Sequence, residues 1–174
     1  MKYTIPKKNR ISPKVEIKSA TIHGKGMFAK ETIKTWETVV IWGGDVFTDK
    51  QWAGQAQKEN KLIMQRDDNL FSVEDRGDDE TYFINHSCDG NLRMKDAFTL
   101  IARTDINKDE EITADYALWE WDENKISKWK CTCGKSCCRK RMTGKDYQSP
   151  QVQKKYAGHF SPLINKRISK MNTL

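Results

Sequence analysis

Residues 83–91 read FINHSCDGN and place an amide, an imidazole, a hydroxyl and a thiol in one short segment. His86 and Cys88 would share one face of a strand, so they could act as a base and its nucleophile. Cys88 could instead be one ligand of a metal site. Asn85 and Ser87 could also do no more than cap a turn. Catalytic Cys–His partners more often meet through the fold than along the sequence, and this favours the metal interpretation.

Four of the chain's five cysteines fall within residues 131–138, in the segment CTCGKSCCRK. The odd total of five and the close spacing of four argue against disulfides and for a metal. At their spacing, three thiolates can close around one tetrahedral Zn²⁺, namely those of Cys131, Cys133 and Cys138. A structural site needs a fourth ligand, and Cys137 would strain to share an ion with the adjacent cysteine. The most economical hypothesis makes Cys88 the fourth ligand and leaves Cys137 free; the alternative is a cluster of reduced thiols without metal.

The net charge of +7 is unevenly distributed along the chain. Residues 1–60 carry a balance of +5, residues 61–123 a balance of −10, and residues 124–174 a balance of +12. A solvated surface of uneven charge would account for this pattern. Alternatively, the acidic middle attracts a cationic substrate and the basic tail, 124–174, binds polyanions or nucleic acid weakly and without sequence preference.

The elements that must position these groups are short strands separated by turns. β-Branched or alternating segments predict strands at 15–20, 38–42, 62–65, 70–73, 98–102 and 111–113. The third and fourth flank Asp67-Asp68-Asn69, which predicts a hairpin. A helix is expected over 49–60, a loose basic arm over 1–14, and two short helices in the tail. The pattern is typical of a mostly-β domain rather than a βαβ one.

The chain has 174 residues, which allows one domain with a real core and a small appendage. No apolar window is long enough to span a membrane, so we expect no membrane contact. The N-terminus lacks the apolar stretch of a secretory signal. We therefore expect an intracellular protein with reduced cysteines, cytoplasmic if it is bacterial, with a nuclear location left open.

Five segments in this order resemble the SET domain of protein-lysine methyltransferases and its post-SET zinc module. The closest matches are FINHSCDGN and DEEITADY; the second of these, taken alone, would be an acidic strand edge with a packed tyrosine. The others are HGKGMFA at 23–29, WGGD at 42–45 and CTCGKSCCRK at 131–140. The small size resembles compact stand-alone members of bacterial type.

The resemblance implies a fold of small curled β-sheets in which FINHSC and the strand ending at Tyr116 cross as a pseudoknot. It divides the chain into an arm, a SET domain, a post-SET zinc module and a basic tail. The arm comprises residues 1–14 and the SET domain residues 15–123, with a variable insert at about 48–80. The zinc module comprises residues 129–141 and the tail residues 143–174.

The same resemblance implies the site residues. S-adenosylmethionine would contact the backbone of Lys25, Gly26 and Met27, the side chains of Asn85 and His86, and Trp129 and Thr132 from the zinc module. Tyr116 would be the catalytic tyrosine, and the substrate channel would be lined by Trp42, Met94 and Ala114. The single zinc ion would be structural and held by Cys88, Cys131, Cys133 and Cys138.

Three residues depart from the family pattern. Trp42 replaces a usual tyrosine, and Tyr82 replaces an arginine that often precedes the Phe-Ile-Asn-His segment. Ala114 lies where many members place a ring that limits how many methyl groups fit, so we expect more than one methyl to be accepted. Ala114→Tyr would then shift the products toward monomethyl-lysine.

Two classes of function follow. The first is an enzyme that methylates a lysine in a basic peptide, which binds as an added strand at a sheet edge. The second is a non-catalytic SET-type scaffold whose basic tail docks nucleic acid or an acidic protein. Retention of Tyr116, Asn85 and His86 favours the enzyme, because a scaffold would not need that set.

Overall fold

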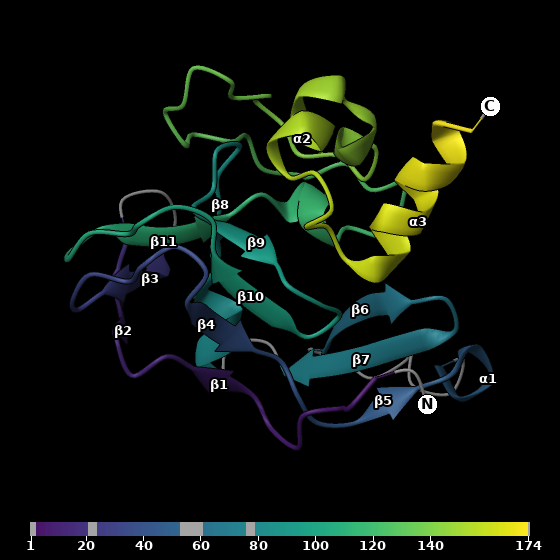
Figure 1. The fold of residues 1–174 in the computed structure, drawn as a ribbon, viewed down its shortest axis with the longest axis horizontal. Helices are drawn as coiled ribbons and strands as arrows, with labels where there is room; N and C mark the ends of the chain where they lie inside the picture. The colour runs from purple at the N-terminus through teal and green to yellow at the C-terminus, as the bar shows by residue number, and fades with distance from the viewer. Residues whose placement is uncertain (1–2, 21–23, 53–60, 76–78, 174) are drawn as a thin grey trace.

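The computed structural model describes residues 3–20, 24–52, 61–75 and 79–173 (Figure 1). Strands outnumber helices in this part of the chain, as the sequence predicts. The strands are β1 (Arg10–Ile11), β2 (Val15–Ser19), β3 (Lys25–Ala29), β4 (Thr38–Ile41), β5 (Val46–Phe47), β6 (Lys61–Asp67), β7 (Leu70–Asp75), β8 (Asn85–His86), β9 (Leu92–Met94), β10 (Thr99–Ala102) and β11 (Glu111–Ala114). The helices are α1 (Asp49–Trp52), α2 (Pro150–Lys155) and α3 (Pro162–Met171), and single 3₁₀ turns are η1 (Glu80–Phe83), η2 (Tyr116–Leu118) and η3 (Asp146–Gln148).

The strands form three small sheets, with the orders β1-β4-β10-β9, β2-β3-β11-β8 and β5-β7-β6. In Figure 1 the β5-β7-β6 sheet lies at the lower right, β2, β3 and β11 lie at the left, and helices α2 and α3 lie above. No helix in the described ranges is long and apolar enough to cross a membrane. The prediction of a mostly-β fold is confirmed.

The pairing of β8 with β11 joins the two segments that carry most of the chemistry. The strands run parallel, with Asn85 opposite Thr113 and His86 opposite Ala114. The Ser87 N–H then donates to the Ala114 carbonyl oxygen at 3.0 Å. FINHSC therefore lies beside the end of DEEITADY, as the expected crossing requires.

The predicted hairpin is confirmed. β6 and β7 pair antiparallel, with Ile63 opposite Val73, and Asn69 adopts a φ of +51° in the turn between them. Asparagine tolerates this left-handed conformation better than most residues do. The helix expected over 49–60 begins as α1 at Asp49, and residues 53–60 of that prediction lie outside the described residues.

The prediction of a loose N-terminal arm is wrong. β1 pairs antiparallel with β4, and Asn9 Oδ1 accepts a hydrogen bond from the Gly43 N–H at 2.7 Å. A Cβ on Gly43 would lie 2.5 Å from the Lys8 carbonyl oxygen, so the arm crosses the glycine backbone in direct contact. These contacts and the packing of Ile11 against the core hold the segment in place. Its basic composition alone indicates a free arm.

The two helices predicted in the tail are present, and they are part of the core. The tail adds Tyr147, Val152, Tyr156, Phe160 and Ile164 to the hydrophobic cluster that contains the strands β4, β10 and β11. Four cations of residues 124–174 are also engaged with carboxylates: Arg139 with Asp115, Lys155 with Asp89, Lys166 with Asp67 and Arg167 with Glu123. Polyanion binding by the tail stays a prediction, but deleting 143–174 cannot test it because the core would lose these side chains.

Candidate functional site

A cavity of about 930 Å³ opens between the β8 segment, the loop after Tyr116 and the loop that leads to the cysteines. Its wall contains eight of the predicted site residues: Lys25, Trp42, Asn85, His86, Tyr116, Trp129, Cys131 and Thr132. Tyr82, which departs from the family pattern, also lines it. A concave, largely aromatic cavity with convergent polar groups is the usual form of a small-molecule site.

Tyr116 lies at the start of η2, directly after β11. Asp115 caps this turn, because its side chain accepts a hydrogen bond from the Ala117 N–H at 3.1 Å. The Tyr116 hydroxyl donates to the Ile84 carbonyl oxygen at 2.7 Å, and the Tyr116 N–H donates to His86 Nδ1 at 3.2 Å. Burial, with a smaller effect of Tyr82, raises the pKa of Tyr116 well above its ordinary value. The phenol is therefore neutral and fixed in direction.

Aromatic rings form much of the cavity wall around Tyr116. Trp119 packs against it with ring centroids 5.5 Å apart, and Trp42 meets Trp119 edge-on at 5.3 Å. Trp129, 42% exposed, lies 6.4 Å from Tyr116 on another side. Sequence reasoning missed Trp119; its position three residues after the tyrosine was the available signal. Such walls attract a cationic side chain and bury its apolar stem.

Two carboxylates, Glu120 and Asp122, also line the cavity and were not singled out in the sequence. Burial raises the pKa of Glu120, and its Oε1 accepts a hydrogen bond from the Asp122 N–H at 3.1 Å. They belong to the acidic block of residues 61–123. Four lysines line the same cavity, Lys25, Lys125, Lys128 and Lys130, so these two carboxylates do not make its wall negative.

Gly26, the second residue of β3, is packed directly against the side chain of Asn85. Asn85 Nδ2 donates to the Lys25 carbonyl oxygen at 3.2 Å and to Glu111 Oε1 at 2.8 Å. A Cβ on Gly26 would lie 2.6 Å from Glu111 Oε1 and 2.9 Å from Asn85 Nδ2. Any larger residue at position 26 would therefore push the Asn85 amide out of its position.

His86 is buried and neutral. Burial lowers its pKa to about 4, while Asp115 acts in the opposite direction. Because its Nδ1 accepts the Tyr116 N–H, its proton belongs on Nε2, which lies 3.4 Å from Cys88 Sγ. His86 therefore connects the tyrosine loop to the thiol cluster, and nothing in this arrangement makes it a base for a nucleophilic thiol.

The four thiols proposed as metal ligands come together from distant segments. The sulfur atoms of Cys88, Cys131, Cys133 and Cys138 all lie within 4.8 Å of one another. Cys88 Sγ and Cys131 Sγ are 3.9 Å apart. A tetrahedral zinc ion with Zn–S bonds of ~2.3 Å requires sulfur separations of ~3.8 Å, so this donor set fits zinc. Cys137 is exposed and lies outside the cluster, with its thiol 3.5 Å from the Cys88 carbonyl oxygen.

Three predicted site residues lie in the core instead of on the cavity wall. Met27, Met94 and Ala114 are each at most 1% exposed and belong to the hydrophobic cluster. For Met27 the expectation concerned its backbone, which is compatible with a buried side chain. Met94 and Ala114 are not among the described residues that line the cavity. A tyrosine at position 114 would have to fit into packed core, which costs stability.

Arg139 ties the cysteine loop to the tyrosine loop. Its two terminal nitrogens donate to both carboxylate oxygens of Asp115 at 2.8 and 2.6 Å, and its Nε donates to Asp146 Oδ2 at 2.8 Å. The Arg139 N–H also points at Cys88 Sγ, 3.4 Å away. The Asp115 side chain is 0% exposed, so this pair is desolvated on the carboxylate side.

We expect Arg139→Met to lower the free energy of unfolding by about 3 kcal/mol, because it leaves the buried Asp115 charge unpaired. The value lies at the low end for a buried pair since Arg139 is itself 19% exposed. Urea unfolding of the zinc-loaded protein measures it. Arg141→Met is the matched control, because exposed Arg141 donates to the Ser127 carbonyl oxygen at 3.2 Å and faces no buried charge. Equal losses in the two variants would contradict the prediction.

Comparison with known proteins agrees with this geometry. The sequence model of the SET domain matches residues 24–117, more than half of the chain. The "Putative histone-lysine N-methyltransferase 1" of Plasmodium falciparum is 31% identical over 139 residues, which are 72% of this chain and 2% of that protein. The "Putative histone-lysine N-methyltransferase ASHH4" of Arabidopsis thaliana is 30% identical over 135 residues, 70% of this chain and 37% of that protein.

The chain thus spans well under half the length of these curated relatives. Among solved structures, the methyltransferase domain of human histone-lysine N-methyltransferase SETMAR superposes with a TM-score of 0.53 at 20% identity. The superposition covers 72% of this chain and 56% of that one, and it supports the fold.

Proposed function

Because the chain belongs to the SET-domain family, we propose that it transfers a methyl group from S-adenosylmethionine to the side-chain nitrogen of a lysine in a protein. The observation that carries the proposal is the Tyr116 hydroxyl, held 2.7 Å from the Ile84 carbonyl oxygen on the wall of an aromatic cavity. The relatives named as histone-lysine methyltransferases are much longer, so the activity and substrate are inferred here from the site of this chain.

The cofactor would occupy the end of the cavity formed by Lys25, Asn85 and His86. S-adenosylmethionine supplies a methyl group on a positively charged sulfur. The backbone of residues 25–27 would hold its methionine part, and the close packing of Gly26 against Asn85 fixes the amide that faces it. Trp129 and Thr132 would close over the adenine, which explains why the loop leading to the cysteines lines the same cavity.

The lysine must reach the methyl group as a neutral amine. Its free pKa of ~10.4 means that the ammonium has to lose a proton at neutral pH, and burial between aromatic rings favours this loss. Tyr116 is not the base, because its raised pKa keeps it protonated. Its hydroxyl proton is donated to the Ile84 carbonyl oxygen, so its lone pairs can accept from the amine and direct it. Alignment of the two reactants then supplies most of the rate.

We propose that the four-thiol cluster binds one structural zinc ion. One ligand, Cys88, follows β8, and the other three come from the loop of residues 131–138. The ion would therefore hold Thr132 and the neighbouring Trp129 over the cavity. Backbone N–H groups face two of the sulfurs, with Arg139 at 3.4 Å from Cys88 Sγ and Lys140 at 3.4 Å from Cys138 Sγ. Such donors stabilise thiolates.

The substrate we propose is a lysine in a basic protein, of the kind named in the relatives. The negative balance of residues 61–123 supports this choice, whereas the cavity wall itself carries four lysines beside Glu120 and Asp122. Acceptance of more than one methyl stays a prediction, since Ala114 is small but lies in the core. If Ala114→Tyr shifts the products toward monomethyl-lysine, it should also lower the stability of the protein, because the ring must fit into packed core.

A non-catalytic scaffold is the competing function. Calorimetry of the zinc-loaded protein with S-adenosylmethionine separates the two, because a scaffold has no use for the cofactor pocket. We expect one cofactor bound per chain and a rise in melting temperature. An absence of both heat and thermal shift would favour the scaffold.

Gly26→Ala should weaken S-adenosylmethionine about tenfold, since the added methyl group must displace the Asn85 amide and break its 2.8 Å bond with Glu111. The same calorimetric titration measures the loss. Far-UV circular dichroism of the variant shows whether the sheets are intact. Wild-type affinity in a folded variant would contradict the role given to this contact.

A further inference from the structure

A surface separate from the cavity carries an exposed tryptophan between basic side chains. Trp36 is 59% exposed. The Arg93 guanidinium lies over its ring, with Cζ 3.5 Å from the ring centroid, and the His159 ring meets it edge-on at 5.4 Å. One face of the indole is therefore covered and the opposite face is the exposed one. None of these three residues lines the cavity as the described residues define it.

The indole is held by a rigid and unusual turn. Trp36 has a φ of +75°, which is rare for a bulky side chain and costs free energy. Its N–H donates to the Ala102 carbonyl oxygen at 2.9 Å, and both the N–H and the hydroxyl of Thr35 donate to Asp105 at 2.9 Å. Backbone strain that neighbouring contacts hold in place is a common mark of a functional site.

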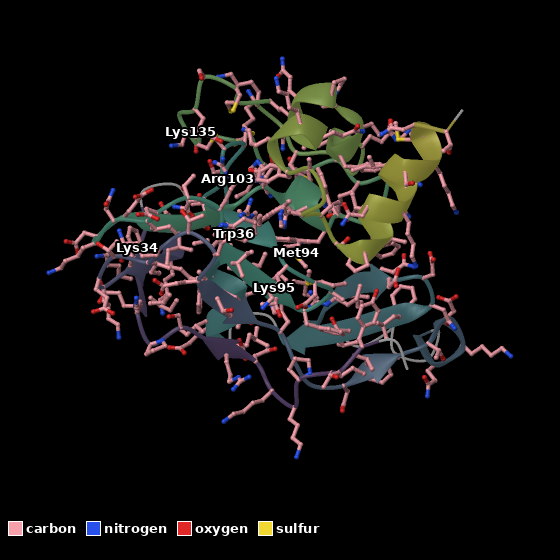
Figure 2. All side chains as sticks on the ribbon, viewed as in Figure 1. Lys34, Trp36, Met94, Lys95, Arg103 and Lys135 are labelled. Atoms are coloured by element: carbon pink, nitrogen blue, oxygen red, sulfur yellow. The ribbon has the colours of Figure 1, made fainter. Side chains whose placement is uncertain are left out.

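Basic side chains lie on the same side of the molecule as the exposed indole. Figure 2 shows Lys34, Trp36, Lys95, Arg103 and Lys135 on one face of the molecule. Burial, with the neighbouring Arg103 guanidinium, lowers the pKa of Arg93. An anion between two such guanidinium groups would relieve their repulsion.

Two carboxylates near this face pair with its cations, and Asp96, exposed beside Lys95, accepts a hydrogen bond from the Phe98 N–H. Asp105 pairs with Lys34 at 2.9 Å, and Asp89 pairs with both Arg103 at 3.0 Å and Lys155 at 2.9 Å. Within the described ranges Arg93 has no carboxylate partner, and its Nε is buried without a hydrogen-bond acceptor. The positive charge of Arg93 is therefore not neutralised by a carboxylate of the described residues.

We infer that this face binds single-stranded nucleic acid, with a base stacked on Trp36 and its phosphates contacted by Arg93, Arg103 and Lys95. A single strand offers flat rings and phosphates at short spacing, which matches an aromatic platform bordered by cations. An acidic peptide would match the charge but not the free indole face, and a duplex keeps its bases stacked internally. Lys34 and Lys135 extend the same positively charged face.

Fluorescence anisotropy of a labelled oligothymidine, titrated at several salt concentrations, tests the inference. Trp36→Asn should weaken binding by about 5- to 150-fold, the range for loss of one stacked base, while leaving the salt slope unchanged. Asparagine tolerates a positive φ, so the turn should be kept, and the melting temperature measures the cost of losing the Arg93 and His159 contacts. Arg93→Gln should weaken binding and also reduce the salt slope by about 0.7, because one phosphate contact is lost.

Lys50→Gln is the charge-matched control, because Lys50 is exposed on α1 at the far right of Figure 1 and should contribute little. Wild-type affinity in Trp36→Asn, or no binding at low salt, would overturn the inference. Tighter binding to duplex than to the single strand would overturn it as well. Polyglutamate binding that is equally sensitive to Trp36→Asn would assign the surface to an acidic protein instead.

Discussion

Cys88→Ser should abolish stoichiometric zinc binding, as Cys131→Ser should, although 43 residues separate the two positions. The four sulfurs lie within 4.8 Å of one another, so removal of any one leaves an incomplete tetrahedron. Structural zinc sites contribute on the order of 10 kcal/mol of apparent binding free energy, and a missing thiolate forfeits a large share of it. The loop that carries Trp129 and Thr132 should then lose its position.

Cys137→Ser is the matched control, because Cys137 is in the same loop but outside the cluster. Metal analysis after dialysis should find one zinc per chain in this variant and in the wild type. Zinc retained in Cys88→Ser and lost in Cys137→Ser would show that the ligand set is wrong.

Tyr116→Phe should lower turnover on the order of 10²- to 10³-fold, the usual effect of removing one hydrogen-bonding group aimed at the reacting atoms. The variant also loses the 2.7 Å bond to the Ile84 carbonyl oxygen. That bond contributes about 1 kcal/mol, so the melting temperature should fall by about 2–4 °C. Cofactor affinity should change little, since the hydroxyl is directed toward Ile84.

Tyr147→Phe controls for the loss of a hydroxyl. Tyr147 is 3% exposed, and its hydroxyl donates to Glu123 away from the cavity wall. This variant should lose a similar amount of stability and keep its turnover. A Tyr116→Phe variant with wild-type turnover would make Tyr116 a packing residue.

The thiol cluster could be predicted from the sequence because its logic is chemical. Three cysteines at short spacing lack one ligand, and Cys88 in FINHSCDGN is the only cysteine outside that loop. The prediction depended on the number of ligands that zinc requires and did not require knowledge of the fold. The cysteine loop then meets Cys88 directly, since the Arg139 N–H lies 3.4 Å from Cys88 Sγ and the Cys137 thiol 3.5 Å from the Cys88 carbonyl oxygen.

The N-terminal arm could not be predicted, because its attachment is made by backbone contacts. The Gly44 N–H donates to the Pro6 carbonyl oxygen at 2.9 Å, and Gly43 is packed directly against Lys8. Such contacts leave no hydrophobic pattern in the sequence, and the basic composition of the segment indicated exposure.

The cavity wall was predicted in part. Residues inside the motifs that carry the resemblance, such as Asn85 and Tyr116, line it. Trp119 and Glu120 lie just beyond the motif, and their position close after the tyrosine was their only signal. Met94 was expected at the channel but is packed in the core on β9. Whether a buried methionine faces a channel or the core depends on how the sheets pack, and spacing along the chain does not report this.

Isotope-labelled methyl transfer is the direct test of the proposed lysine methylation. The zinc-loaded protein is incubated with labelled S-adenosylmethionine and a mixture of basic proteins, and the products are mapped by mass spectrometry. We predict label on lysine side-chain nitrogens, greatly reduced with Tyr116→Phe and retained with Tyr147→Phe. A protein that binds the cofactor yet labels no lysine, or labels equally well without the Tyr116 hydroxyl, would contradict the account.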